Sequence, residues 1–178
     1  MSDSKNNFSI KNLPAFKIAS LAILIAVTTV FTYIIRIPIA PTRGYINFGD
    51  VAIFFTAITF GPMTAFLAGG LGTALADLLA GYAQWAPITF FAHGIQGLLI
   101  GIIIGKKINI IRILFSFLAA TIVMAGIYYI TAGIMYGFGP ALAEIPGNIL
   151  QNVAGIAVGL PLAAAVKKAY PPIQNYKW

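Results

Sequence analysis

Polar side chains at helical spacing form the most chemically informative pattern in this sequence. His93 and Gln96 are three residues apart, and Asn148, Gln151 and Asn152 stand at positions i, i+3 and i+4, so each set occupies one face of a helix. Amide and imidazole groups both donate and accept hydrogen bonds. The two sets therefore suit a small heteroaromatic ligand with hydroxyl groups or ring nitrogens. The alternative is bonding between the two helices, worth about 0.6 kcal/mol per bond within a membrane.

The acidic side chains each allow more than one interpretation. Asp50 stands at a predicted helix start, where capping of free backbone N–H groups is favoured over ligand contact. Asp77 is either a hydrated surface carboxylate, a partner of Arg36 or Arg43, or a residue that faces a binding pocket. Glu144 falls in a predicted outer loop, where we expect it to be solvated.

Two aromatic residues, Tyr82 and Trp85, stand between two predicted helices. Tyrosine and tryptophan are enriched where a membrane meets water, so both can be interfacial anchors. The alternative is a stacking face for a planar ligand.

The composition places these residues in a membrane protein. Of 178 residues, 60% are hydrophobic and 8% are charged, against about 25% charged in an average soluble domain. The formal net charge of +7 then reports membrane orientation rather than nucleic-acid binding. The absence of cysteine and the single histidine exclude disulfides, cysteine nucleophiles and a histidine-based metal site.

Long uncharged runs predict the membrane spans, at about 20 apolar residues per crossing. The stretch 47–82 is ambiguous, because one continuous helix would be roughly 52 Å long. Phe60-Gly61-Pro62 in its middle favours a break, since Gly follows helix ends and Pro begins helices. We therefore predict an all-α polytopic membrane protein with six transmembrane helices, at about 15–35, 48–60, 62–81, 87–104, 109–135 and 146–167.

The basic residues support this count. Cytoplasmic segments of membrane proteins carry an excess of Lys and Arg. Six helices place three groups of basic residues on the cytoplasmic side. The first group is Lys5, Lys11 and Lys17, the second is Lys106, Lys107 and Arg112, and the third is Lys167, Lys168 and Lys177. Both termini are then cytoplasmic, with a polar N-terminal segment 1–14, a membrane domain 15–168 and a C-terminal tail 169–178. We expect the first run to be a span rather than a cleaved signal peptide, because its 18 uncharged residues exceed the usual 7–15.

On this topology the polar and aromatic residues gather at the outer end. The outer connections are about 36–47, 82–86 and 136–146. Polar groups within a bilayer tend to face a cavity or the bundle interior. The one-sided clustering predicts a pocket that opens to the outside.

Motifs for catalysis and energy conversion are missing. The sequence has no Walker A motif, zinc motif or serine-hydrolase elbow, so we expect no enzyme activity in this chain. Small residues recur every four positions at Gly97 and Gly101, at Gly155 and Gly159, and at Ala22 and Ala26. Such faces allow close helix packing in lipid, mostly within the bundle, and one of them can dock a partner protein.

An Ala-rich first helix and a long outer first loop occur together with several short motifs. The motifs are Asn47-Phe48-Gly49-Asp50, Phe60-Gly61-Pro62, residues 68–82, Pro87, His93-Gly94-Ile95-Gln96-Gly97 and Gly101. With these features the sequence resembles a known family, the S components of energy-coupling factor (ECF) transporters, in the subgroup linked to hydroxymethylpyrimidine or pyridoxine uptake.

The resemblance implies a substrate-capture subunit in a prokaryotic plasma membrane. A transmembrane T component and two ABC-type ATPase subunits would be its partners, and ATP would be used by those ATPases, with no cofactor in this chain. Ala22 and Ala26 would contact the T component, with Ala15 and Ala19 as the alternative register, and residues 38–47 would form a lid. The expected substrate-binding residues are Asn47, Asp77, Tyr82, Trp85, His93, Gln96, Asn148 and Asn152.

Two other functions fit the same sequence. One is a solitary secondary carrier that works without a motor. The other is a membrane assembly factor whose outer polar cluster is structural. Within the ECF interpretation, pyridoxine, hydroxymethylpyrimidine and thiamine-like compounds all offer a flat ring with polar substituents.

Overall fold

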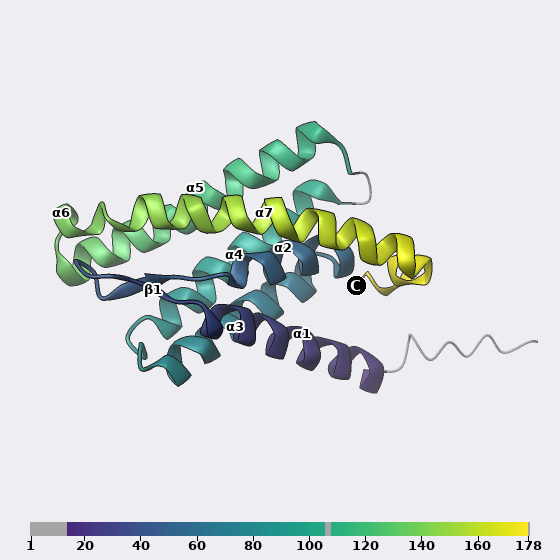
Figure 1. Cartoon of the computed structure of the whole chain (residues 1–178), viewed down its shortest axis with the longest axis horizontal. Helices are drawn as coiled ribbons and strands as arrows, with labels where there is room; N and C mark the ends of the chain where they lie inside the picture. The colour runs from purple at the N-terminus through teal and green to yellow at the C-terminus, as the bar shows by residue number, and fades with distance from the viewer. Residues whose placement is uncertain (1–13, 106–107, 178) are drawn as a thin grey trace, which may run out of the picture.

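The computed structural model describes residues 14–105 and 108–177, which form a helical bundle with one small hairpin. The elements are α1 (Pro14–Ile34), β1 (Ile37–Ile39), β2 (Gly44–Ile46), α2 (Gly49–Phe60), α3 (Pro62–Ala80), α4 (Ala86–Ile104), α5 (Ile110–Tyr136), α6 (Phe138–Ala141), α7 (Glu144–Ala169) and the 3₁₀ helix η2 (Pro171–Tyr176). The hairpin and α6 lie at one end, and the start of α1 and the C-terminus lie at the other (Figure 1).

The six predicted helices are confirmed to within two residues at each end, as α1 to α5 and α7. Within the described ranges, five helical segments are long and apolar enough to cross a membrane, and α2 is shorter. The chain is therefore a multi-pass all-α membrane protein. The hairpin and α6 were not predicted; both lie in the outer connections.

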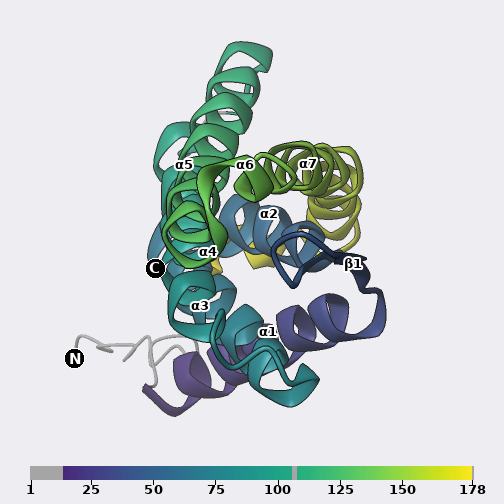
Figure 2. The same ribbon diagram turned by 90° about the vertical axis from the view of Figure 1, so that its left-hand side faces the viewer.

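The break between α2 and α3 has the predicted cause. Gly61 has φ 98° and ψ 179°, a conformation that favours glycine, and Pro62 is the first residue of α3. The 12 residues of α2 are too few to cross a bilayer alone. Neighbouring helices surround α2 at the centre of the bundle (Figure 2), so it meets protein rather than lipid.

The glycine stripes on α4 and α7 are used for internal packing. A Cβ atom added at Gly97 would lie 2.8 Å from the carbonyl oxygen of Ala65 on α3, and one added at Gly159 would lie 2.8 Å from that of Val51 on α2. Only glycine permits such close approach of two helix backbones. These stripes bring α3 to α4 and α2 to α7, which positions the polar faces of α4 and α7.

The alanines on α1 have a different environment. Ala22 and Ala26 are exposed and line an apolar groove of about 580 Å³ between α1 and α3, formed with Ile25, Thr29, Val30, Leu75, Leu78 and Leu79. The small-residue face of α1 is therefore open in the isolated chain.

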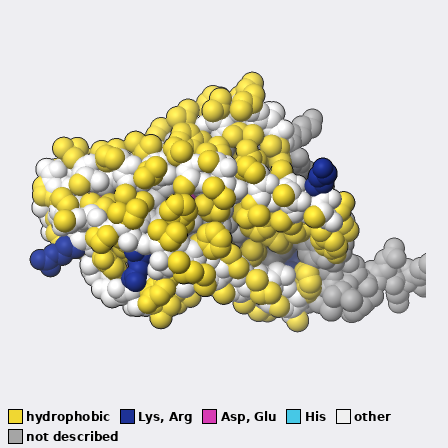
Figure 3. Space-filling view, viewed as in Figure 1, with side chains coloured by type: hydrophobic (Ala, Val, Ile, Leu, Met, Phe, Trp, Pro, Cys, Tyr) yellow, Lys and Arg dark blue, Asp and Glu magenta, His cyan; other side chains and the backbone are white. Residues whose placement is uncertain are grey.

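The ends of the bundle agree with the predicted topology. Arg112 Nη1 donates to the Ile104 carbonyl at 3.3 Å, and Lys177 Nζ donates to the Gly105 carbonyl at 2.9 Å, so the α4–α5 turn and the C-terminal tail share one end. Hydrophobic side chains cover the face seen in Figure 3, with Lys and Arg toward its two ends. The predicted cytoplasmic residues Lys5, Lys11, Lys106 and Lys107, like nearly all of the predicted segment 1–14, lie outside the described residues.

Candidate functional site

A small cavity lies under the hairpin, at the end of the bundle opposite the C-terminus. Its volume is about 20 Å³, room for about one water molecule. The lining comes from β2, from the loops before α2 and before α4, and from the helices α3, α4, α5 and α7. Its residues are Gly44, Tyr45, Asn47, Asp77, Trp85, Thr89, Tyr128, Glu144, Asn148 and Gln151. This lining combines aromatic walls with hydrogen-bonding groups, as ligand pockets do.

The hairpin pairs Ile37 with Ile46 and Ile39 with Gly44, and its turn holds Arg43 at φ 52°. A non-glycine residue rarely adopts this left-handed conformation. The Arg43 carbonyl oxygen accepts a hydrogen bond from Trp85 Nε1 at 3.2 Å, which ties the strained turn to the α3–α4 loop.

Tyr45 connects the hairpin to α3. Its hydroxyl donates to Asp77 Oδ1 at 2.5 Å, and its ring centroid lies 4.7 Å from that of Tyr82. Burial, reinforced by the charge of Asp77, raises the pKa of the Tyr45 phenol well above its ordinary value, so the phenol remains a donor at physiological pH. Among the described residues Asp77 makes no ion pair with Arg36 or Arg43, and it is buried, so the pairing and solvation interpretations are both wrong.

Two bonds connect the same segment to α7. The Thr42 hydroxyl donates to the Glu144 carboxylate, and the backbone N–H of Asn47 donates to Gln151 Oε1 at 2.6 Å. Glu144 is 4% exposed, so the prediction that it is solvated is wrong. The hairpin folds over the start of α7 and covers this carboxylate.

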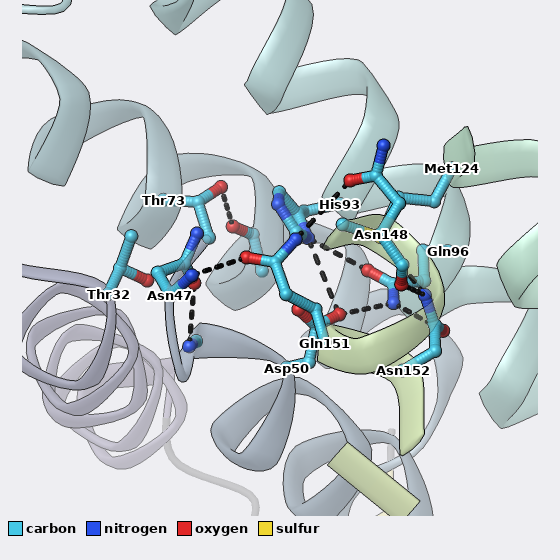
Figure 4. A network of polar contacts seen from close by, with 12 residues as sticks. Thr32, Asn47, Asp50, Thr73, His93, Gln96, Met124, Asn148, Gln151 and Asn152 are labelled. Atoms are coloured by element: carbon cyan, nitrogen blue, oxygen red, sulfur yellow. Dashed lines mark hydrogen bonds and ion pairs between the residues drawn. The ribbon is translucent and has the colours of Figure 1, made fainter. Parts of the chain in front are cut away.

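A buried polar network lies next to the cavity (Figure 4). Gln96 Nε2 donates to the Asp50 carboxylate and, at 2.9 Å, to Asn152 Oδ1. Gln96 Oε1 lies 2.8 Å from His93 Nδ1, and since an amide oxygen only accepts, the proton of this bond belongs to Nδ1. All four side chains are fully buried, so one glutamine joins α2, α4 and α7.

Asp50 therefore does not cap α2, and the favoured capping interpretation is wrong. Phe48 is the residue before the helix, and its own side chain makes no capping hydrogen bond. Asn47 Oδ1 instead accepts from the Gly49 N–H at 2.8 Å, and Asp50 turns inward toward Gln96 and His93. The carboxyl group faces the bundle because both sides of the α2 start are packed against other helices.

The structure separates the eight predicted site residues into two layers. Asn47, Asp77, Trp85 and Asn148 line the cavity, and Tyr82 packs against Tyr45 beside it. His93, Gln96 and Asn152 are not part of the lining and belong to the buried network.

Several lining residues with polar or aromatic side chains were not predicted as site residues: Tyr45, Thr89, Tyr128, Glu144 and Gln151. Gln151 had a signal as a member of the polar face that it shares with Asn148 and Asn152. Two others also had a signal in the sequence. Thr89 stands four residues before His93 and so shares its helix face, and Tyr128 is a phenol within a long apolar run. The Tyr128 hydroxyl donates to Thr89 Oγ1 at 2.8 Å.

A family model and two known proteins match most of this chain. A family model described as "ECF-type riboflavin transporter, S component" matches residues 12–168. An "Uncharacterized protein in gap 3'region" from Pyrococcus woesei is 41% identical over 145 residues, which cover 82% of this chain and 97% of that protein. The "Thiamine precursor transporter HmpT" from Lactococcus lactis subsp. cremoris (strain MG1363) is 33% identical over 153 residues, 85% of this chain and 88% of that protein.

Proposed function

The chain belongs to the S component family of ECF transporters, and on that premise we propose that it captures a thiamine precursor, hydroxymethylpyrimidine, at the outer face of the membrane. Its family and its apolar helices make it a multi-pass protein of the prokaryotic plasma membrane, the vitamin- or precursor-binding subunit of its transporter. The choice of precursor is supported by the similarity to the thiamine precursor transporter.

The cavity under the hairpin is the observation that carries the proposed binding site. Trp85, Tyr45 and Tyr128 supply flat apolar surfaces, and Asn47, Asp77 and Asn148 supply hydrogen-bonding groups. Since the cavity holds about one water molecule, a pyrimidine ring enters after the hairpin moves away from α3 and α7. The bonds from Tyr45 and Thr42, and from the Asn47 backbone, then close the site again.

Delivery to the cytoplasm requires partners in this proposal. A T component would dock on the Ala22 and Ala26 face of α1, and two ABC-type ATPase subunits would hydrolyse the ATP that drives toppling of the bundle. The exposed groove beside these alanines supports the choice of face.

Titration calorimetry of the purified chain tests the capture function. We expect one-to-one binding of hydroxymethylpyrimidine, with weaker binding of pyridoxine, thiamine and riboflavin. Tight binding of another member of this panel would change the identity of the substrate and still support the capture function. A folded protein that binds none of them would favour the assembly-factor alternative, and failure to co-purify with T and ATPase subunits would favour the solitary carrier.

Removal of the Trp85 ring is expected to weaken substrate binding. The indole is 2% exposed, lines the cavity and packs near Tyr128 and Tyr136, with ring centroids 5.7 and 6.1 Å away. For Trp85→Ala we expect a roughly 10- to 100-fold higher Kd, the loss of about 1.4–2.8 kcal/mol of stacking and packing.

Trp85→Phe is the matched comparison, because it keeps an aromatic wall and removes the Nε1 donor to Arg43. Its Kd should lie between those of the wild type and Trp85→Ala. An unchanged Kd in Trp85→Ala, with both variants folded, would remove this ring from the proposed site.

A further inference from the structure

Two buried polar atoms at the cavity have no hydrogen-bond partner among the described residues: Asp77 Oδ2 and Asn148 Nδ2. Both side chains line the cavity, and they are 2% and 3% exposed. A buried polar atom without a partner destabilises a fold, so such atoms at a binding cavity indicate where a ligand supplies the missing partner.

The other oxygen of Asp77 is already occupied by the Tyr45 hydroxyl. The Thr89 hydroxyl, which accepts a hydrogen bond from Tyr128, also lines the cavity. In this proposal Asp77 is ionised when it meets the ligand, and an ionised carboxylate only accepts hydrogen bonds. Asp77 therefore offers the ligand one acceptor position.

A chain of hydrogen bonds fixes the orientation of the Asn148 amide. The backbone N–H of Asn47 can only donate, so the atom of Gln151 that it contacts at 2.6 Å is the oxygen. The Gln151 amide nitrogen is then the donor to Asn148, and the Asn148 oxygen accepts it at 3.3 Å. Asn148 Nδ2 is left unbonded, and Asn148 offers the ligand a donor.

We propose that Asp77 and Asn148 together recognise a ring edge that carries an N–H donor beside a ring-nitrogen acceptor, the amidine edge of a 4-aminopyrimidine. The exocyclic amine donates to Asp77 Oδ2, and the adjacent ring nitrogen accepts from Asn148 Nδ2. This assignment rests on the proposed capture function and adds the pair of residues that selects the substrate.

The same edge with a 4-oxo group has the opposite pattern. The 4-oxo compound has a carbonyl oxygen in the position of the amine, and its adjacent ring nitrogen carries a hydrogen and donates instead of accepting. The carbonyl oxygen then meets the Asp77 carboxylate, and the ring N–H meets the Asn148 amine. The site therefore discriminates the two compounds by the order of donor and acceptor rather than by size.

The test compares the Kd of 4-amino-5-hydroxymethyl-2-methylpyrimidine with that of its 4-oxo counterpart, by calorimetry on the purified full chain. We expect the wild type to prefer the amino compound. Asp77→Asn keeps the shape of the side chain and introduces an amide that can donate, so the preference should fall by about tenfold or more, the effect of roughly one buried hydrogen bond. Asn148→Asp replaces the donor by an acceptor and should also shift the preference toward the oxo compound.

Asn109→Asp is the matched control for Asn148→Asp, since it makes the same change at an exposed residue outside the cavity lining, where the side chain accepts from the backbone N–H of Arg112. Its ratio of the two Kd values should equal that of the wild type. An unchanged ratio in folded Asp77→Asn, or an equal change in Asn109→Asp, would overturn the assignment.

Failure of this assignment can be told apart from failure of the capture function. Wild-type protein that binds the amino compound, with variants that keep its preference, contradicts the role of Asp77 and Asn148 and leaves capture intact. Wild-type protein that binds another vitamin and neither pyrimidine contradicts the aminopyrimidine edge alone. Wild-type protein that binds no vitamin contradicts both.

Discussion

Replacement of Ala22 by Trp is expected to abolish substrate uptake by cells and to leave substrate binding by the purified protein unchanged. Ala22 is exposed on α1 and lines the groove of about 580 Å³ between α1 and α3. An indole there would occupy the groove and keep a partner helix from the small-residue face. The residues that line the cavity belong to other segments, so binding should be spared.

Uptake of labelled substrate, measured beside calorimetry, tests this expectation. Ala19→Trp reports on the alternative register of small residues, and Ile122→Trp places the same ring on a residue of α5 that is 69% exposed. Ile122→Trp should transport like the wild type. Normal uptake by Ala22→Trp would argue against this face, and loss of uptake in Ala19→Trp alone would move the contact to the other register.

Gln96→Leu is expected to destabilise the protein more than the other substitutions considered above. The change removes the donor to Asp50 and to Asn152, and it removes the acceptor of His93. Each buried group left without its partner costs about 1–3 kcal/mol, so the sum is a large part of a typical 5–15 kcal/mol. A melting temperature lower by roughly 10 °C or more is the expected result.

Gln84→Leu provides the comparison, because Gln84 is exposed in the α3–α4 loop. Its melting temperature should be close to that of the wild type. The double change of Gln96 and Asp50 to Leu should recover part of the loss, since it also removes the buried carboxylate. If Gln96→Leu has the same melting temperature as the wild type, the network contributes little to stability.

The helices were predictable because each is a long apolar segment with a local end signal. The glycine–proline pair divides α2 from α3 as expected. The hairpin was not predictable in the same way: each strand has three residues, too few for a strand pattern to be read. Its contacts from Tyr45 to Asp77 and from Asn47 to Gln151 join segments far apart in the sequence.

The sequence was enough to assign the site residues to helix faces. It was not enough to tell which of them line the cavity and which belong to the buried network. Spacing of three or four residues assigns His93, Gln96 and Thr89 to one face of α4, and all three are buried. It does not show that Thr89, one turn nearer the outer end, lines the cavity while His93 and Gln96 belong to the network. The predicted environments of Asp50 and Glu144 were wrong for a related reason. Both side chains are buried by segments that lie far from them in the sequence.

The central position of α2 has a consequence for how the protein is made. Helices enter a membrane in the order of their synthesis, and α2 is among the first to emerge, yet at 12 residues it is too short to span the lipid. Its neighbour α7, whose Gly155 and Gly159 pack directly against Phe54 and Val51, is synthesised last of the long helices. The chain therefore cannot finish its insertion one helix at a time, because α2 stays incompletely covered by protein until α7 has been made.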